Sequence, residues 1–350
     1  MGKTLVVTND FPPRLGGIET FVYELTRRLP PERLVVLTAS MPGAAAFDAG
    51  LAFPVHRLAA STLLPTPAVA RTARELIDLH RCDSVWFGAA ATLGLLAPTL
   101  RSHPGVRRVV ASTHGHERTW ARVPAGRPVL RRIAGAVDCL TYISDAVLGT
   151  LRRALPPKPP RLVRLTPGVD LDAFASRTRA PGPPGSAPIG ANPDALRTRL
   201  GVPSGPLVVC VSRLVALKGQ DVLLRAWPSV VGGCPDATLL LVGKGPRRRA
   251  LEAQVRRLGI ERSVRFAGGL PFAAIPDVYA AADVAVLLTR PVAAGLVEEG
   301  LGAVTLEASA SGLPVVVGRT GGAVETVQDG RTGFLVDPRD AGEVADRIGW

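Results

Sequence analysis

The chain has 350 residues, of which 47% are hydrophobic and 20% charged, and its formal net charge is +13. This length and composition are typical of a globular protein of two ordinary domains, and they exclude a disordered chain. The positive charge favours anionic partners such as nucleotides, acidic lipid surfaces or nucleic acid.

The cysteines and the N-terminal residues indicate a reducing compartment. The four cysteines show no CxxC or Cys/His spacing, which argues against a zinc site and a disulfide framework. No signal peptide is expected, because Lys3 is followed by a short strand and then by polar residues. The longest uncharged run, 85–100, is shorter than a membrane span. We therefore expect a cytoplasmic protein that is soluble or bound to a membrane surface.

Short β-rich runs alternate with helical patterns in the first half of the chain. The first strand, 5–8, leads through a loop that ends in Gly16 and Gly17 to an amphipathic helix, the opening of a nucleotide-type α/β unit. Two glycines before a helix favour an anion-binding turn over a plain strand–helix turn. Further strands are expected at 34–38, 55–58, 84–87, 109–113, 139–143 and 162–165, with helices that include 68–80 and 145–154. The alternation predicts a parallel sheet with helices on both faces.

A Pro/Gly-rich stretch separates two α/β domains. Residues 1–172 form the first, 173–205 read as a linker or insertion, and 206–350 form the second. In the second domain we expect strands at 207–211, 239–242, 264–267, 284–288, 314–317 and 334–336, and helices at 220–227, 247–258, 275–282, 304–311 and 323–327. Ligands of open parallel sheets bind at the carboxyl ends of strands, so two such domains in tandem predict a site in a cleft between them.

Two carboxylates eight residues apart stand in the stretch EGLGAVTLEASASG. Glu299 lies in a glycine-rich loop and Glu307 lies inside the following helix. Gly302 lets the backbone approach a ligand, and the first free N–H groups of the helix suit a phosphate. Carboxylates on either side can accept hydrogen bonds from hydroxyl groups. The stretch therefore suits a nucleotide-sugar, although a solvated glutamate pair on a surface loop has the same spacing.

Cations and histidines follow two other strands. Arg213 and Lys218 stand five residues apart, and such a pair can bind one diphosphate or be a solvated strand-end pair. His114 and His116 flank a glycine, and a histidine there can donate a hydrogen bond near neutral pH. No third ligand for a metal is near in sequence. We expect transfer without a metal ion, with the two cations neutralising the leaving group.

Several motifs together resemble a known family. The segments EGLGAVTLEASASGLPVVVG and GGAVETVQDGRTGFLV are similar to the signature of the family-four retaining glycosyltransferases, which have the two-Rossmann GT-B fold. TNDFPPRLGGIET, VWFGAAATLGLLAP, ASTHGHE and SRLVALKGQD are most similar to the subfamily of phosphatidylinositol mannoside mannosyltransferases, which move mannose from GDP-mannose to an inositol phospholipid. The resemblance runs from residue 3 to about residue 340.

The resemblance implies a role for each matching residue. Glu299 would hold hydroxyls of the donor sugar and Glu307 those of the ribose, while Arg213 and Lys218 would clamp the diphosphate. Further donor contacts would come from Gly16, Gly17, Gly268, Leu270, Gly302, Ala303 and Val304. The reaction would take place at His114, with Glu299, Arg213 and Lys218 as the other catalytic residues. Acceptor contacts would come from Asn9, Asp10, Gly17 and His116. No cofactor is implied.

The sequence also departs from the family pattern. Leu217 and Glu19 stand where arginine and glutamine are expected, and the loop after Phe266 has no charged residue before Asp277 to recognise guanine. The chain ends shortly after a helix begins near Ala341, so that either it is a fragment or the family's final crossover helix is absent.

The acceptor implied by the resemblance is a membrane lipid. Basic residues on the first domain, among them Arg71, Arg74, Arg81 and two Arg-Arg pairs, favour peripheral binding to the inner face of the plasma membrane. The alternatives are a family-four hexosyltransferase with another donor or a soluble acceptor, and a nucleic-acid-binding protein. The latter leaves the glutamate pair unexplained, and the chain has no basic face rich in aromatic residues.

Overall fold

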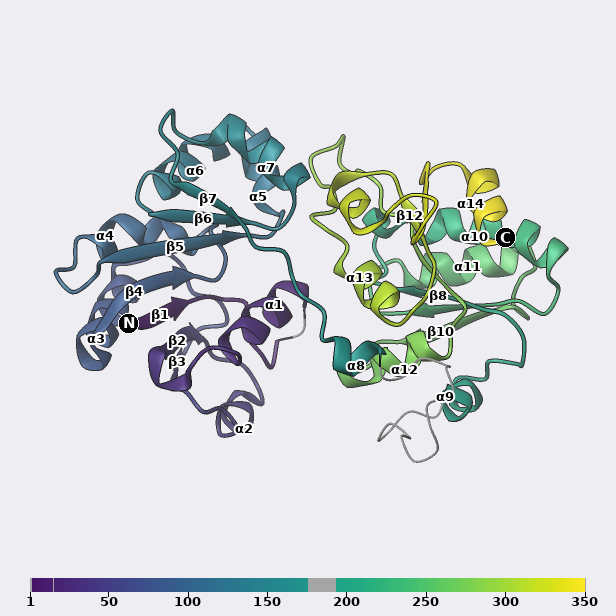
Figure 1. Ribbon diagram of the computed structural model, residues 1–350, viewed down its shortest axis with the longest axis horizontal. Helices are drawn as coiled ribbons and strands as arrows, with labels where there is room; N and C mark the ends of the chain where they lie inside the picture. Colours follow the sequence, from purple (N-terminus) through teal and green to yellow (C-terminus); the bar gives the residue numbers. More distant parts are fainter. Residues whose placement is uncertain (1, 15, 176–192, 350) are drawn as a thin grey trace. The chain divides into compact units, whose positions relative to one another are not determined.

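The structure is a computed structural model that describes residues 2–14, 16–175 and 193–349. It divides into two compact units, 1–167 and 168–350, each built on one parallel sheet (Figure 1). The boundary between them falls five residues before the one we expect from the sequence.

The first unit contains seven parallel strands in the order β3-β2-β1-β4-β5-β6-β7. The strands are β1 Lys3–Val7, β2 Leu34–Ala39, β3 Val55–Leu58, β4 Cys82–Phe87, β5 Arg108–Thr113, β6 Cys139–Tyr142 and β7 Arg161–Arg164. Each lies within two residues of its predicted ends. The strand order changes direction between β1 and β4, which is where open α/β sheets bind their ligands.

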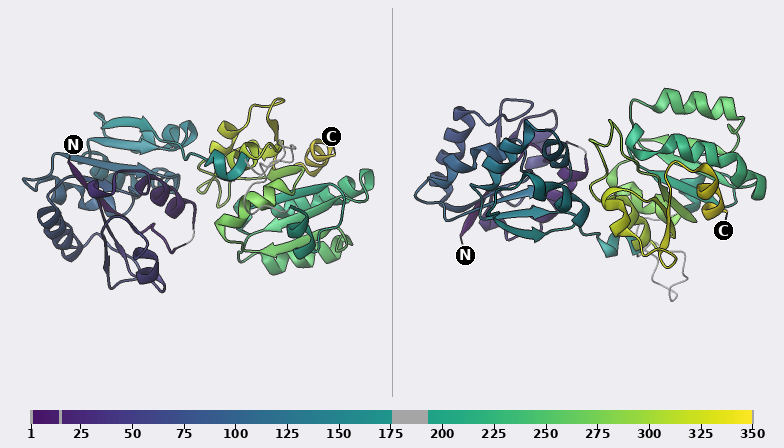
Figure 2. Two further views of the ribbon diagram at one scale, coloured as in Figure 1. Left: turned by 60° about the horizontal axis from the view of Figure 1, so that its bottom comes forward. Right: turned by 90° about the horizontal axis from the view of Figure 1, so that it is seen from above.

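Helices cover both faces of this sheet (Figure 2). They are α1 Gly17–Thr26, α2 Ala44–Asp48, α3 Pro67–His80, α4 Ala97–Arg101, α5 Glu117–Arg122, α6 Gly126–Ala134 and α7 Asp145–Leu151, with 3₁₀ turns η1 Pro31–Arg33, η2 Leu93–Leu96 and η3 Arg152–Ala154. Because side chains alternate along a strand, Leu5 and Val7 join one hydrophobic core and Val6 joins another on the opposite face.

The second unit repeats this plan with six parallel strands in the order β10-β9-β8-β11-β12-β13. The strands are β8 Leu207–Val211, β9 Thr238–Val242, β10 Val264–Gly268, β11 Val284–Leu287, β12 Val315–Gly318 and β13 Gly333–Val336. The helices are α8 Leu171–Ala175, α9 Pro193–Arg199, α10 Gln220–Gly233, α11 Arg248–Leu258, α12 Ile275–Ala280, α13 Ala303–Ala310 and α14 Ala341–Ile348, with 3₁₀ turns η4 Ala216–Lys218, η5 Phe272–Ala274 and η6 Gly321–Thr326. Two cores again flank the sheet.

Two helices differ most from the sequence prediction. The helix expected at 220–227 continues to Gly233, because Trp227 and Val230 are both buried and packing carries it past Pro228. The helix expected at 323–327 is instead the 3₁₀ turn η6, which begins with two glycines that disfavour a regular α-helix.

The expected linker 173–205 contributes to the core of the second unit at both ends. Phe174, Leu196 and Val202 are buried in the same core as Tyr279. The rings of Phe174 and Tyr279 lie 6.1 Å apart. Residues 176–192 of this stretch lie outside the described part of the chain. No helix among the described residues is long and apolar enough to span a membrane.

Candidate active site

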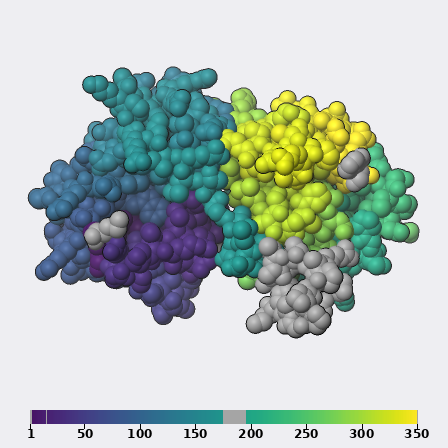
Figure 3. Space-filling model, viewed as in Figure 1, coloured from purple at the N-terminus to yellow at the C-terminus, as the bar shows by residue number. Residues whose placement is uncertain are grey.

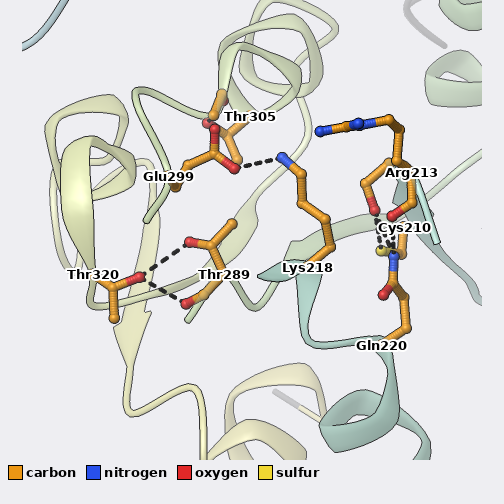
Figure 4. Close-up of polar contacts among 10 residues, drawn as sticks. Cys210, Arg213, Lys218, Gln220, Thr289, Glu299, Thr305 and Thr320 are labelled. Atoms are coloured by element: carbon orange, nitrogen blue, oxygen red, sulfur yellow. Dashed lines mark hydrogen bonds and ion pairs between the residues drawn. The ribbon is translucent and has the colours of Figure 1, made fainter. Parts of the chain in front are cut away.

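Two residues distant in sequence meet at the carboxyl ends of the strands of the second unit. Lys218 ends η4, which follows β8, and Glu299 lies in the loop between β11 and α13. The Lys218 Nζ atom lies 2.5 Å from Glu299 Oε2 (Figure 4). The two side chains are only 13% and 14% exposed. The pair is therefore an ion pair largely withdrawn from solvent.

The surroundings keep Glu299 ionised. Burial raises the pKa of its carboxyl, but the Lys218 ammonium and the backbone N–H groups of Leu301 and Gly300 outweigh burial, so the pKa is lowered from its ordinary value. A carboxylate in this state is a strong acceptor for hydroxyl donors.

Two glycines position the loops of Lys218 and Glu299 through close contacts with the backbone of other segments. Gly219 has a φ of +67°, and a Cβ there would clash with the carbonyl oxygen of Leu288. Gly321 has a φ of +55°, and a Cβ there would clash with the carbonyl oxygen of Glu299, which also accepts the N–H of Gly322 at 3.1 Å. Sequence reasoning missed these positions, although the glycine after Lys218 and the Gly-Gly pair were visible signals.

The first turn of α13 is the predicted phosphate seat. Gly302 is its N-cap with a φ of +81°, and Ala303 and Val304 present N–H groups that have no acceptor within the helix. Thr305 Oγ1 donates to the Gly302 carbonyl at 2.7 Å, and Tyr279 donates to the Val304 carbonyl at 3.0 Å. These bonds hold the turn rigid, as anion binding by backbone N–H groups requires.

Glu307 lies one turn further along α13 and is half-buried. Burial raises the pKa of its carboxyl to about 7. Its carboxyl makes no hydrogen bond or ion pair to another described residue. It can therefore accept hydrogen bonds from a ligand. Because its raised pKa favours the protonated carboxyl, binding must offset the free energy of ionising it.

Arg213 is exposed, and its guanidinium extends toward the side of the site where Lys218 and Glu299 meet (Figure 4). Its loop is held by Gln220, whose Nε2 donates to Ser212 Oγ and to the Arg213 carbonyl, both at 2.9 Å. Gln220 is 2% exposed and is a positioning residue that sequence reasoning missed. Leu217, at the position of the expected arginine, accepts the N–H of Arg290 at 2.9 Å through its carbonyl.

The loop after β10 contains the other two predicted donor contacts. Gly268 has a φ of +70°, and its carbonyl accepts the N–H of Gly243 at 2.7 Å. Leu270 packs partly buried against the core. No hydrogen bond or ion pair between described residues joins these two to Lys218 or Glu299, so their donor contacts stay predictions.

A second polar cluster lies at the end of β5 in the first unit. His114 Nε2 lies 2.6 Å from the Gly88 carbonyl oxygen, which can only accept, so Nε2 carries the proton and Nδ1 is left as an acceptor. Its ring meets the edge of Phe21 at 5.0 Å. Burial lowers the pKa of His114 despite the neighbouring carboxylate of Glu117. The imidazole is therefore neutral at physiological pH.

Glu117 organises this cluster. It is fully buried, and its Oε2 accepts the N–H groups of His114 and Gly115 at 3.0 and 3.2 Å. Its Oε1 lies 3.2 Å from His116 Nε2, and His116 is 39% exposed. The sequence places Glu117 beside the histidines but does not indicate that its carboxylate fixes the backbone of both His114 and Gly115.

The remaining predicted acceptor residues follow β1. Asn9 donates to the Leu63 carbonyl at 3.0 Å and accepts the Leu63 N–H at 2.6 Å, so its amide holds a neighbouring loop. Burial raises the pKa of Asp10, with a smaller rise from Glu117, against the opposing effect of His116 and Arg14. Asp10, His116 and Glu117 are therefore coupled electrostatically.

The two glycines at the start of α1 differ in their surroundings. A Cβ at Gly16 would clash with the Glu19 carboxylate, whereas one at Gly17 would meet nothing within 4 Å. Glu19 lies in the first turn of α1. Its carboxylate competes with an anion at this helix terminus, which is the physical consequence of glutamate in place of the expected glutamine.

Two family models match the chain. One, described as Glycosyl transferases group 1, covers residues 205–350, and the other, Glycosyltransferase Family 4, covers 15–173. The chain is 44% identical over 355 residues to the "GDP-mannose-dependent alpha-(1-6)-phosphatidylinositol monomannoside mannosyltransferase" of Mycolicibacterium smegmatis, covering 99% of this chain and 88% of the relative. The chain belongs to the family-four glycosyltransferases.

Two further relatives carry similar names. The glycosyltransferase is 42% identical to the Mycobacterium tuberculosis protein of the same name, with 99% of this chain and 88% of that protein covered. It is 41% identical to the "GDP-mannose-dependent monoacylated alpha-(1-6)-phosphatidylinositol monomannoside mannosyltransferase" of Corynebacterium glutamicum, with 99% and 87% covered.

Solved structures confirm the predicted fold. Anabaena Alr3699/HepE in complex with UDP and glucose superposes with a TM-score of 0.78 at 21% identity, covering 99% of this glycosyltransferase and 89% of that chain. Sucrose-phosphate synthase from Thermosynechococcus elongatus gives a TM-score of 0.76 at 22% identity, covering 99% and 88%. The chain has the GT-B fold of two Rossmann-like units in tandem.

Proposed function

We propose that this glycosyltransferase moves mannose from GDP-mannose to an inositol phospholipid of the phosphatidylinositol monomannoside type, with an α linkage and without a metal ion. Three relatives that share 41–44% identity across nearly the whole chain support the donor and the acceptor. The proposed chemistry rests on the ion pair between Lys218 and Glu299. Both side chains are largely shielded from solvent, and Glu299 lies in the loop before α13.

The donor is held by the second unit in this proposal. Lys218 and Arg213 bind the diphosphate, together with the N–H groups of Ala303 and Val304. Glu299 accepts hydrogen bonds from hydroxyls of the mannose, and Glu307 accepts those of the ribose. As the diphosphate departs, Lys218 and Arg213 neutralise its growing negative charge. In other enzymes a metal ion has this role.

The acceptor is held by the first unit. Asp10 and His116, coupled through the buried Glu117, are polar groups suited to an inositol headgroup. His114 is neutral and has a free Nδ1 acceptor for a hydroxyl at the reaction centre. The attacking hydroxyl approaches from the face of the leaving group and passes its proton to the departing phosphate, so no separate base is required.

A lipid acceptor requires the enzyme to work at a membrane. We propose that it binds the inner face of the plasma membrane from the cytoplasm, supported by the net charge of +13. Exposed cations attract the anionic headgroups of such a surface, and each adds about 1 kcal/mol to binding.

Radiolabelled sugar transfer tests the proposal. GDP-mannose and UDP-glucose are supplied in turn, each with an inositol lipid and with a water-soluble inositol phosphate, in the presence and absence of EDTA. We expect label in the lipid from GDP-mannose alone, unchanged by EDTA and lost in Glu299→Ala and Lys218→Ala proteins. Label from UDP-glucose alone would overturn the donor assignment.

A soluble acceptor is the second candidate. The chain is 33% identical over 237 residues, 65% of its length, to a "D-inositol 3-phosphate glycosyltransferase" of Corynebacterium urealyticum, of which 52% is covered. Preferential transfer to the soluble inositol phosphate in the same assay would favour this candidate over the lipid.

A further inference from the structure

A surface hollow of about 680 Å³ lies on the first unit, and none of the site residues described above lines it. Its lining combines two arginines with an apolar wall and consists of Arg131, Arg152, Leu155, Pro156, Pro157, Pro159 and Leu162. These residues come from α6, η3, the segment that leads into β7 and β7 itself. They belong to the teal part of the surface of the first unit in Figure 3. A hollow of this volume is large enough for a lipid headgroup.

The arginines of the hollow have no carboxylate partners among the described residues. Between residues 126 and 164 the chain has eight arginines and lysines but only two aspartates. Both aspartates are already paired, Asp138 with Arg101 at 2.6 Å and Asp145 with Arg164 at 3.0 Å. Within this stretch of the chain, the positive charge around the hollow exceeds the negative charge.

The fold places Arg131 and Arg152 on one surface. Leu130 and Ile133 turn one side of α6 into the core, so that Arg131 is exposed. Helix α6 packs against η3, which begins with the exposed Arg152. Both residues thus line one hollow, although they stand 21 positions apart in the sequence.

Protection of a sheet edge explains only part of this charge. Strand β7 is one of the two edge strands of its sheet, and cations and prolines on an edge prevent pairing with another chain. Arg161 and Arg164 lie on β7 and serve that purpose. Arg131 and Arg152 lie on α6 and η3, so edge protection does not account for them.

The composition of the lining selects among anionic ligands. No aromatic side chain is present on which a nucleic-acid base could stack. Arginine forks match the oxygen atoms of a phosphate, and a wall of leucine and proline suits the apolar region just below a headgroup. This combination fits an anionic phospholipid better than RNA.

We propose that the Arg131–Arg152 hollow binds the headgroup phosphate of an anionic phospholipid and docks the first unit on the membrane. This docking site is separate from the acceptor site at His114. The inference deepens the proposed function and rests on it in one respect, since an enzyme with a soluble acceptor would not need to dock. Helix α3 is the rival surface, but its Arg71 and Arg74 share the helix with Glu75 and Asp78.

Vesicle co-sedimentation of the full chain tests the docking site. The vesicles contain phosphatidylcholine with 30% phosphatidylinositol, and the variant is Arg131→Ala/Arg152→Ala. We expect its vesicle affinity to fall on the order of thirtyfold. The matched control, Arg71→Ala/Arg74→Ala, removes the same charge from α3 and is expected to fall by less than threefold. Equal losses in the two variants, or an unchanged affinity in the first, would overturn the proposal.

Two further measurements separate docking from folding and from catalysis. The melting temperature of the Arg131→Ala/Arg152→Ala protein is expected to match that of the wild type, because both side chains are exposed. Its transfer to an acceptor dispersed in detergent is expected to be unchanged. If the wild type binds vesicles through the hollow but transfers no mannose, the proposed function fails while the docking site stands. If single-stranded RNA binds through the hollow and vesicles do not, the docking site fails.

Discussion

Lys218 and Glu299 are two charges that depend on each other. Each side chain is less than one-sixth exposed, so removing one partner leaves the other with little water to solvate it. The pair keeps a cation and an acceptor preorganised for the donor. A donor diphosphate can then share the ammonium while the sugar hydroxyls bind the carboxylate.

Replacing Lys218 with methionine is expected to cost about 3 kcal/mol of unfolding free energy at pH 7, because an unpaired carboxylate remains buried. The cost should shrink at pH 5, where Glu299 can take up a proton. Urea denaturation at both pH values measures the difference. The Lys218→Met/Glu299→Gln protein should recover most of the stability, yet its transfer rate should stay at least a hundredfold below that of the wild type. A cost independent of pH would contradict this description of the pair.

Donor binding is expected to be coupled to the ionisation of the Glu307 carboxyl. Its folded pKa of about 7 lies above its ordinary value of 4.5, so the native state holds more protons than the unfolded state and stability falls as pH rises from 4.5 to 7. Ribose hydroxyls favour the ionised carboxyl. We therefore expect the affinity for GDP-mannose, whose diphosphate does not titrate near neutral pH, to increase by up to about tenfold between pH 6 and 8, with proton release near pH 6.5.

Calorimetry in two buffers of different ionisation enthalpy measures that proton release. The Glu307→Gln protein has a side chain of the same size that does not titrate. It should bind GDP-mannose with an affinity that is flat over this pH range and should release no proton at this site. Identical pH profiles for the two proteins would show that Glu307 does not contact the donor.

The turn between η4 and α10 sets the position of Lys218 through a single glycine. Gly219 and Gly259 have nearly the same φ, +67° and +68°, but only Gly219 lies against another backbone. The Gly219→Ala substitution should therefore cost more than about 3 kcal/mol of unfolding free energy, and Gly259→Ala about 1 kcal/mol from backbone strain alone. Urea denaturation of both proteins separates contact from strain. Equal costs would mean that Leu288 moves away easily.

Local patterns were sufficient to predict the strands. Each is a short apolar run bounded by glycine, proline or polar residues, and its ends were predicted to within two residues. Helix ends were harder, because packing rather than composition decides them. Buried Val230 extends α10 past a proline, and the Gly-Gly start of η6 prevents a full α-helix.

The candidate site could be predicted only in part. The loop glutamate, the helix start and the two cations were recognisable as a set, but their roles remain predictions. The Lys218–Glu299 contact joins residues 81 apart, and no local pattern records it. The same holds for Glu117, whose full burial follows from how α5 packs, and for Asn9, whose amide pairs with the distant Leu63.

The molecule consists of two units with separate hydrophobic cores, and the predicted donor contacts other than Gly16 and Gly17 lie in the second. We therefore expect residues 168–350, expressed alone, to unfold cooperatively and to bind GDP within about threefold of the full chain, as independent domains do. The isolated unit should transfer no mannose, because His114 and the acceptor residues lie in the first unit. Loss of GDP binding on excision would show that the first unit completes the donor site.

The most direct test of the central claim is the NMR spectrum of the product that the purified full chain makes from GDP-mannose and phosphatidylinositol monomannoside. Our proposal predicts a second mannose in α linkage, formed with retention of the donor's configuration. A β-linked mannose would contradict the retaining mechanism. An unmodified lipid beside active transfer to a soluble acceptor would contradict the assignment of the acceptor.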